Sequence, residues 1–192
     1  LKEDEILKTI DNLGEFGAQE IRFTGGEPMI AKSLPKYIRR ANDWGLRTSI
    51  GTNAMLATVS LAQVLGENGL DAAIVSIDGL EESHNHVRGK GSFAKTLEGI
   101  KNLRNEGVEV RVNMVVLRVN FTDVVPFVEM AVREGLSVML RRFIASGRGE
   151  HLSQGGITWQ EYEKLRQDLD PYLKNSQVHV DGHYLKSEQT PS

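Results

Sequence analysis

The chain has 192 residues, of which 40% are hydrophobic and 26% charged, a composition typical of a soluble globular protein. The net charge of −3 gives no electrostatic reason to expect a nucleic-acid or membrane partner. The chain contains no cysteine, which excludes disulfides, cysteine nucleophiles and thiolate-bound metals within these residues. No secretory signal or membrane-spanning apolar stretch is seen, so we expect a cytoplasmic protein.

Helical and β-type patterns alternate along the chain. We predict strands at residues 20–24, 46–52, 72–78, 109–117 and 136–143. Amphipathic helical patterns cover about 2–16, 33–44, 58–68, 92–106, 122–134 and 158–173. This alternation with short connections is typical of an α/β protein with a parallel sheet, either doubly wound or an arc of a (β/α) barrel.

Each predicted strand has one apolar face and one polar face. In the run 109–117, Val110 and Val112 share a face, while Glu109 and Arg111 point the other way. A parallel sheet covered by helices on both sides reads as nearly continuous apolar runs, so the polar face must meet water or a polar ligand. We therefore predict a partial, open (β/α) barrel at residues 1–175. A C-terminal extension at 176–192 would begin a missing or loose segment.

The stretch EIRFTGGEPMI, at residues 20–30, ends a strand in a loop without bulky side chains. Ligands of parallel α/β folds bind beyond the carboxyl ends of strands, and glycines let a ligand approach the backbone. In this interpretation Glu27 accepts a hydrogen bond from a cation such as an ammonium group, and Pro28 stiffens the exit. A tight turn with a solvent-facing glutamate is an equally open interpretation.

Several motifs, in order, resemble the radical S-adenosylmethionine (radical SAM) superfamily. They are IRFTGGEP (21–28), TNA (52–54), VSIDGLEESHNHVRGKGSF (75–93), VRVNMVVLRVN (110–120) and RRFIASGRG (141–149). They are similar to the peptide- and tetrapyrrole-modifying (SPASM/twitch-type) subgroup and to the molybdenum-cofactor cyclases. The resemblance implies about five parallel strands of a (β/α)6 core that lacks its first strand.

The resemblance also implies residues that bind the cofactor S-adenosylmethionine. Gly25, Gly26 and Glu27, followed by Pro28, would contact its methionine moiety. Ser76 would take the carboxylate or a ribose hydroxyl, and Asp78 is a weaker candidate for the ribose. Ser76 is alternatively a small residue at a crowded strand end.

Further positions are candidates for the cofactor or the substrate. Thr52, Asn53 and Arg111 are assigned to the cofactor site, although Asn53 is alternatively a turn residue and Arg111 could pair with Glu109 or Asp78. Positions matching Arg22, Thr52 and Arg111 face the substrate in the molybdenum-cofactor cyclases. The substrate-binding candidates are Arg22, Arg88 and Arg148. No catalytic side chain and no metal ligand is assigned, and His84 and His86 are expected to be solvated on a polar loop.

The absence of cysteine departs from the family pattern. Radical SAM enzymes hold a [4Fe–4S] cluster with three cysteines after the first strand, and this chain supplies none. We expect the chain to be a fragment of a parent protein that carries the cluster, and to be inactive alone. A degenerate relative that has lost the cluster is the other interpretation.

The implied parent enzyme, of oxidoreductase or lyase type, cleaves S-adenosylmethionine reductively to a 5′-deoxyadenosyl radical. This radical would abstract hydrogen from a peptide or tetrapyrrole substrate, with electrons from a donor such as flavodoxin or ferredoxin. The alternative is a cluster-free, non-catalytic barrel that binds a ligand or a peptide. An aldolase-type lyase ranks lower, because no predicted strand ends in the lysine that it requires.

Overall fold

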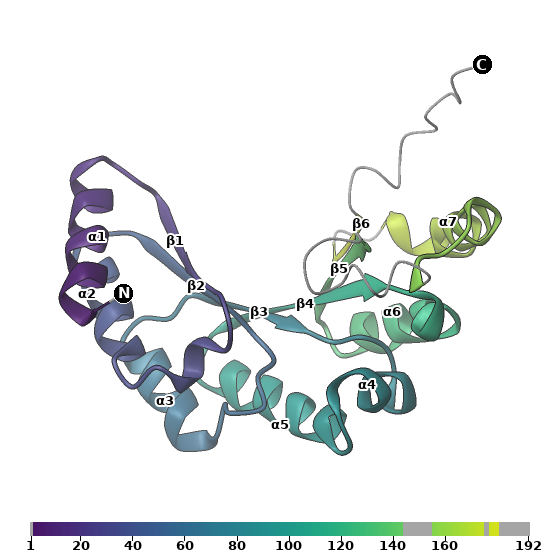
Figure 1. Ribbon diagram of the computed structural model, residues 1–192, viewed down its shortest axis with the longest axis horizontal. Helices are drawn as coiled ribbons and strands as arrows, with labels where there is room; N and C mark the ends of the chain where they lie inside the picture. The colour runs from purple at the N-terminus through teal and green to yellow at the C-terminus, as the bar shows by residue number, and fades with distance from the viewer. Residues whose placement is uncertain (1, 144–154, 175–176, 181–192) are drawn as a thin grey trace. The chain divides into compact units, whose positions relative to one another are not determined.

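The computed structural model describes residues 2–143, 155–174 and 177–180 (Figure 1). Its strands are β1 (Glu20–Phe23), β2 (Arg47–Thr52), β3 (Ala72–Ser76), β4 (Glu109–Val116), β5 (Ser137–Arg142) and β6 (Val178–Val180). Its α-helices are α1 (Glu3–Glu15), α2 (Leu34–Asp43), α3 (Val59–Glu67), α4 (Glu81–Arg88), α5 (Ser92–Asn105), α6 (Val124–Arg133) and α7 (Trp159–Leu173). Two short 3-10 helices are η1 (Pro28–Ile30) and η2 (Arg118–Asp123).

The strands form one open sheet in the order β1-β2-β3-β4-β5-β6. β2 is parallel to both β1 and β3, and β6 is parallel to β5. Strands that follow one another in the chain are therefore neighbours in the sheet, as βα units with right-handed crossovers require. The predicted α/β fold, a partial barrel of parallel strands, is confirmed. β6 was not predicted, because three residues are too few for a periodic signal.

The two faces of the strands differ as predicted. On β4 and the residue before it, every position of the apolar face is buried, namely Val108, Val110, Val112, Met114 and Val116. The alternate positions Glu109 and Arg111 are exposed. The apolar face stabilises the sheet by removing side chains from water, at about 25 cal/mol per Å² of apolar surface. The polar face remains available for ligands.

The chain divides into two compact units. The first is formed by Leu1–Ser76 and Ala94–Arg111, and the second by Ile77–Phe93 and Val112–Ser192. In the first unit α1 and α2 pack through a buried cluster of Ile10, Tyr37, Ala41 and Leu46. Each unit is considered by itself below.

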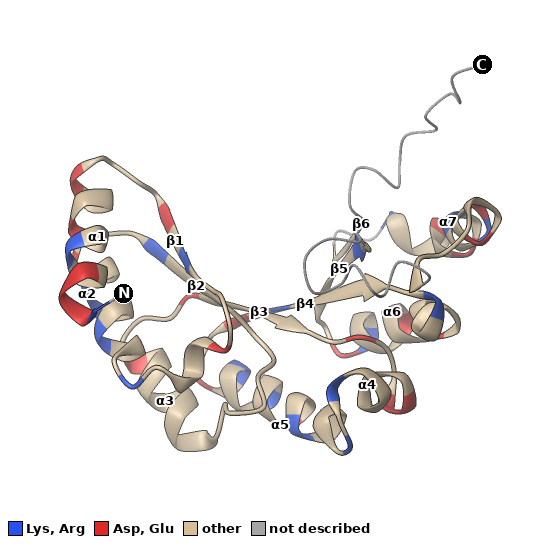
Figure 2. Cartoon of the chain, viewed as in Figure 1, with Lys and Arg blue, Asp and Glu red and all other residues tan. Residues whose placement is uncertain are grey.

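Opposite charges lie on α1 and α2, as the colours of Figure 2 show. Lys36 Nζ lies 2.6 Å from Glu3 Oε1, and Arg40 Nε lies 2.5 Å from Asp11 Oδ1. These side chains are partly exposed, and surface ion pairs of this kind contribute little to stability. They orient the two helices, while the buried cluster supplies most of the stability.

One local prediction is wrong. The segment after Asp78 forms helix α4 and is not a polar loop. His84 lies within α4 and is buried, whereas His86 is exposed as expected. Polar residues dominate α4, so its short apolar face gave too weak a periodicity to predict a helix.

Among the described residues, no helix has the length and apolar character needed to cross a membrane.

Candidate functional site: the diglycine loop and the polar sheet face

Glu27 is the best-anchored side chain of the loop after β1. Its Oε1 accepts hydrogen bonds from Thr52 Oγ1 at 2.7 Å and from the Met29 backbone N–H at 3.2 Å. Its Oε2 accepts from the Asn53 backbone N–H at 2.9 Å. The carboxylate thus joins the diglycine loop, the start of η1 and the end of β2. The interpretation of a solvent-facing glutamate in an isolated turn does not fit these contacts.

The two glycines of this loop adopt conformations that other residues rarely take. Gly25 has φ of 96° and Gly26 has φ of 36°, in the region that L side chains disfavour. A Cβ atom built at either position would have no neighbour within 4 Å, so the backbone borders open space. The backbone of both glycines is therefore accessible to a ligand.

The segment after β2 completes this corner. Thr52 is buried and its Oγ1 accepts the Ala54 N–H at 2.9 Å while donating to Glu27. Asn53 Oδ1 accepts the Met55 N–H at 2.9 Å, which makes Asn53 a turn-forming residue. Ala54 has φ of 59°, the only positive value among the described residues other than glycine. Thr52 and Asn53 therefore lie beside Glu27, and their assignment to the cofactor site stays a prediction.

A polar face crosses the sheet of the first unit. Arg22 on β1 pairs in register with Ser49 on β2. Arg22 Nε lies 3.5 Å from Ser49 Oγ, at the limit of a hydrogen bond, and Ser49 Oγ donates to Glu20 Oε1 at 3.0 Å. Arg22 is exposed, so most of its guanidinium is available to a ligand.

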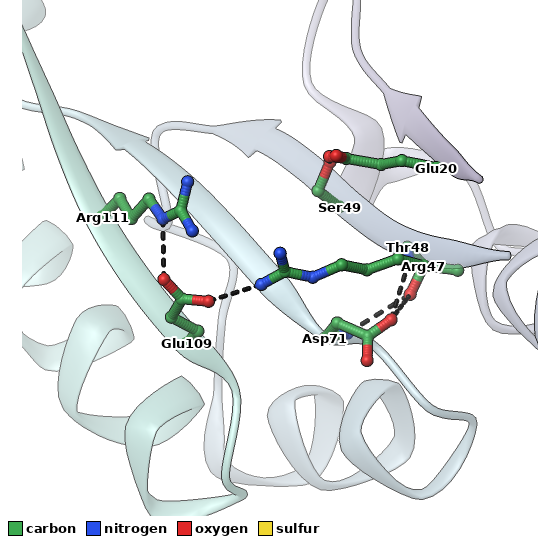
Figure 3. Close-up of polar contacts among 7 residues, drawn as sticks. All are labelled: Glu20, Arg47, Thr48, Ser49, Asp71, Glu109 and Arg111. Carbon is green, nitrogen blue, oxygen red and sulfur yellow. Dashed lines mark hydrogen bonds and ion pairs between the residues drawn. The ribbon is translucent and has the colours of Figure 1, made fainter.

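Figure 3 shows a second cluster on the same face, formed by Arg47, Glu109 and Arg111. Arg47 Nη2 donates to Glu109 Oε2 at 2.6 Å, and Arg111 Nε donates to Glu109 Oε1 at 2.7 Å. The hydrogen bond from Arg111 is the main cause that lowers the pKa of the Glu109 carboxyl; burial opposes it, and the charges of Arg111 and Arg47 lower the pKa further. Arg111 therefore pairs with Glu109, as one of the sequence interpretations allowed.

Arg47 was missed as a site residue. It lies in register with Glu20 and two positions before Ser49, so strand alternation places it on the polar face. This alternation along the strand was the sequence signal that could have identified Arg47. Ser76, at the end of β3, continues the face of Ile74, which lies in register with Gly51. Ser76 is half-buried and has no side-chain hydrogen bond within the described residues.

Asp78 and Arg88 belong to the second unit and form an ion pair between a buried carboxylate and an exposed guanidinium there. Arg88 Nε lies 2.6 Å from Asp78 Oδ2, and the Asp78 side chain is only 5% exposed. The Asp78 N–H donates to His84 Nδ1 at 3.1 Å, and its carbonyl accepts from Asn120 Nδ2 at 3.1 Å. Asp78 is thus fixed through its backbone and through its Oδ2 atom.

The buried His84 was not predicted. Its Nδ1 accepts a hydrogen bond, so the proton of the neutral ring is on Nε2, which has no hydrogen-bond partner among the residues that the structure describes. Burial lowers the pKa of His84, opposed by the charge of Asp78 and reinforced by that of Arg88. The predicted residue Arg148 lies outside the described residues.

The chain offers no suitable ligand set for an iron–sulfur cluster. It has no cysteine, and such clusters are held by cysteine thiolates. Within residues 2–143, 155–174 and 177–180, no group of three His, Asp or Glu side chains is placed to hold a metal ion. The residues present thus fit the organic cofactor but not the cluster.

Comparison with known families identifies the class of protein. Residues 1–131 match the Radical SAM superfamily, so the chain belongs to that superfamily. The Fe-coproporphyrin III synthase of Methanosarcina barkeri is 31% identical over 202 residues, which cover 96% of this chain and 50% of that protein. The AdoMet-dependent heme synthase of Oleidesulfovibrio alaskensis is 32% identical over 195 residues, covering 97% of this chain and 50% of that protein. The chain thus spans half the length of both curated relatives.

A solved structure supports the fold. The structure of anSMEcpe with bound AdoMet, which is S-adenosylmethionine, and Kp18Cys peptide superposes with a TM-score of 0.76. The match covers 94% of this chain and 55% of that chain at 18% sequence identity. At this identity the likeness establishes a common fold, and it leaves the substrate of the present chain to be argued separately.

Proposed function

We propose that this chain is the cofactor-binding part of a radical SAM enzyme that modifies a tetrapyrrole or a peptide. The single observation that carries the proposal is the diglycine loop, held open beside the end of β2 by the three hydrogen bonds that Glu27 accepts. Family membership adds the cofactor, since anSMEcpe of the same fold binds AdoMet. S-adenosylmethionine held there would, on receiving one electron and releasing methionine, supply the radical chemistry that removes a hydrogen atom from the substrate.

The residues of the first unit have distinct proposed roles. The open backbone of Gly25 and Gly26 receives the methionine ammonium group, while Glu27 keeps the loop in shape and adds negative charge. Ser76 offers a hydroxyl with no hydrogen bond to the described residues, which suits a carboxylate or a ribose oxygen. In the second unit, considered by itself, Arg88 orients the Asp78 carboxylate through their ion pair.

Three arginines of the polar sheet face suit a substrate with carboxylates. Arg22, Arg47 and Arg111 are all exposed. The two glutamates on this face, Glu20 and Glu109, offset two of the three positive charges, so one positive charge is in excess. A guanidinium binds a carboxylate through two parallel hydrogen bonds. The names of the relatives, an Fe-coproporphyrin III synthase and a heme synthase, favour a tetrapyrrole, and the peptide bound by anSMEcpe keeps a peptide as the second class.

The electron source and the cluster lie outside this chain in the proposal. Because these residues include no cysteine, the cluster ligands come from residues that are not among the 192. A flavodoxin or ferredoxin is the proposed donor. The absence of cysteine also favours a second candidate function, a cluster-free barrel that binds a ligand or peptide without catalysis.

One experiment separates the two functions. The complete gene product is loaded anaerobically with iron and sulfide, mixed with S-adenosylmethionine and dithionite or reduced flavodoxin, and assayed for 5′-deoxyadenosine by mass spectrometry. The enzyme is expected to release 5′-deoxyadenosine and to take up stoichiometric iron. A gene product that binds no iron and releases no 5′-deoxyadenosine with either electron donor would instead support the binding module. The variant Gly25→Ala is tested in the same assay, and Gly89→Ala is its matched control because both positions have positive φ and open surroundings.

A further inference from the structure

We propose that three residues on one face of α5, Thr96, Gly99 and Asn102, position the cofactor loop. The inference rests on the proposed function for its consequence, but its structural basis is independent of it. These residues are spaced three apart, so they lie along one side of the helix. All three are turned toward the segment 53–57 that follows β2.

The two polar residues of this face donate to backbone carbonyls of the segment. Thr96 is fully buried and its Oγ1 donates to the Asn53 carbonyl at 3.0 Å. Asn102 Nδ2 donates to the Ala57 carbonyl at 2.8 Å. The segment therefore has both ends attached to the same helix. Without these donors, the two carbonyls would lack partners in a largely buried location.

Gly99 allows the helix to approach the middle of the segment. A Cβ atom at this position would lie 2.0 Å from the Ala54 carbonyl oxygen, far inside van der Waals contact. Ala54 is buried and has the positive φ of 59°, a conformation that L residues avoid. The contacts from α5 on either side keep Ala54 in that conformation.

The attached segment in turn fixes Glu27. Asn53, the first residue of the segment, donates its N–H to Glu27 Oε2. Ala54 donates its N–H to Thr52 Oγ1, and this hydroxyl in turn donates to Glu27 Oε1. A continuous series of hydrogen bonds thus runs from α5 to the diglycine loop, entirely within the first unit. The segment and α5 border the same hollow of about 660 Å³, which is lined in part by Ala57, Gly99 and Asn102.

The test compares two substitutions that remove the same kind of bond from the first unit. Thr96→Val removes the hydroxyl that holds Asn53. The control Thr48→Val acts at the opposite end of β2, where the fully buried Thr48 Oγ1 donates to the Gly69 carbonyl at 2.9 Å. Hydrogen exchange is measured on the complete gene product for the amides of Met29 and Asn53, which both donate to Glu27.

We expect these two amides to exchange about fivefold faster in Thr96→Val than in Thr48→Val, as the loss of one buried hydrogen bond implies. Thr96→Ser, which keeps the hydroxyl, is expected to restore slow exchange. The KM for S-adenosylmethionine should rise in Thr96→Val with a smaller change in kcat. Equal exchange and equal KM in Thr96→Val and Thr48→Val would overturn the inference. Exchange as expected in a protein that never cleaves S-adenosylmethionine would overturn the proposed function and leave the inference standing.

Discussion

The carboxylate of Glu27 accepts three hydrogen bonds, so a substitution that removes one acceptor oxygen tests their contribution to stability. Glu27→Gln keeps the shape but replaces one acceptor oxygen with a donor nitrogen. That nitrogen must then face Thr52 Oγ1 or the Asn53 N–H, both of which donate to Glu27 in the structure. We expect a loss of about 1–3 kcal/mol in the free energy of unfolding, measured by urea denaturation.

The control for Glu27→Gln is Glu98→Gln on α5. Glu98 is exposed and makes no hydrogen bond or ion pair within the described residues. Its substitution is expected to change stability by less than about 0.5 kcal/mol. Equal stabilities of the two variants would show that the contacts of Glu27 contribute nothing measurable.

His84 makes stability depend on pH in a defined direction. Burial lowers its pKa in the folded chain below the value of about 6.5 in the unfolded chain. Above the unfolded pKa both states are neutral and the contribution of His84 to stability is fully present. As the pH falls through the folded pKa, the unfolded state binds the proton first and stability is lost.

The corresponding measurement is the free energy of unfolding of wild type and His84→Gln between about pH 7.5 and about pH 5. Wild type is expected to lose more stability over this range, because the variant has no buried imidazole to protonate. His86→Gln is the control, since His86 lies exposed on the same helix. If His84→Gln and His86→Gln had the same pH profile, the burial argument would be wrong.

Residue types and strand phase made part of the site predictable. The diglycine loop stood out because glycines at a strand end have no packing purpose, and alternation placed Arg22 and Arg111 on the polar face. The partners of those residues were less accessible. That Arg111 bonds to Glu109 in preference to Asp78 depends on side-chain conformations within the folded sheet. The three contacts from α5 depend on how a helix packs, which has no local sequence signal.

At the scale of elements, the connection between β4 and α6 depends on one buried side chain. Asn120 in η2 donates from Nδ2 to the carbonyls of Asp78 and Val115, and its Oδ1 accepts the Leu117 N–H at 2.8 Å. It is fully buried. The amide thus holds the turn after β4 against the turn that contains Asp78.

Replacing this amide with a hydrocarbon leaves three backbone groups without partners. Each buried unsatisfied group costs about 1–3 kcal/mol, so Asn120→Leu should destabilise the protein by several kcal/mol in urea denaturation. Asn105→Leu on α5 is the matched control, because Asn105 is exposed and makes no side-chain hydrogen bond within the described residues. A loss no larger than that of the control would contradict the assigned role.

Helices with a clear apolar periodicity were predicted closely. The helices α1, α5 and α7 have 13, 14 and 15 residues and matched their predicted ranges closely. α4, with eight residues and a mostly polar sequence, was missed. Its existence depends on the burial of His84 against Phe93, whose ring centroid lies 5.7 Å away. Such a contact is decided by tertiary packing.

At the scale of the whole chain, the lack of cysteine predicts its behaviour toward iron. These 192 residues, expressed alone and treated anaerobically with iron and sulfide, should take up only substoichiometric iron and show no cluster absorbance. Iron analysis and visible spectroscopy measure both. Stoichiometric iron in this chain would mean that non-thiolate ligands hold a cluster, and the division of labour proposed above would be wrong.

The position of β1 at the end of the strand order has a consequence for the handling of this chain. β1 has β2 as its single neighbour in the described sheet, so its other side presents backbone N–H and C=O groups that a foreign segment can satisfy. Glu20 and Arg22 place charges on this short strand, which discourages indiscriminate aggregation. Short extended peptides are therefore the reagents to add when concentrated samples of these residues precipitate, because they would terminate the growth of intermolecular ladders.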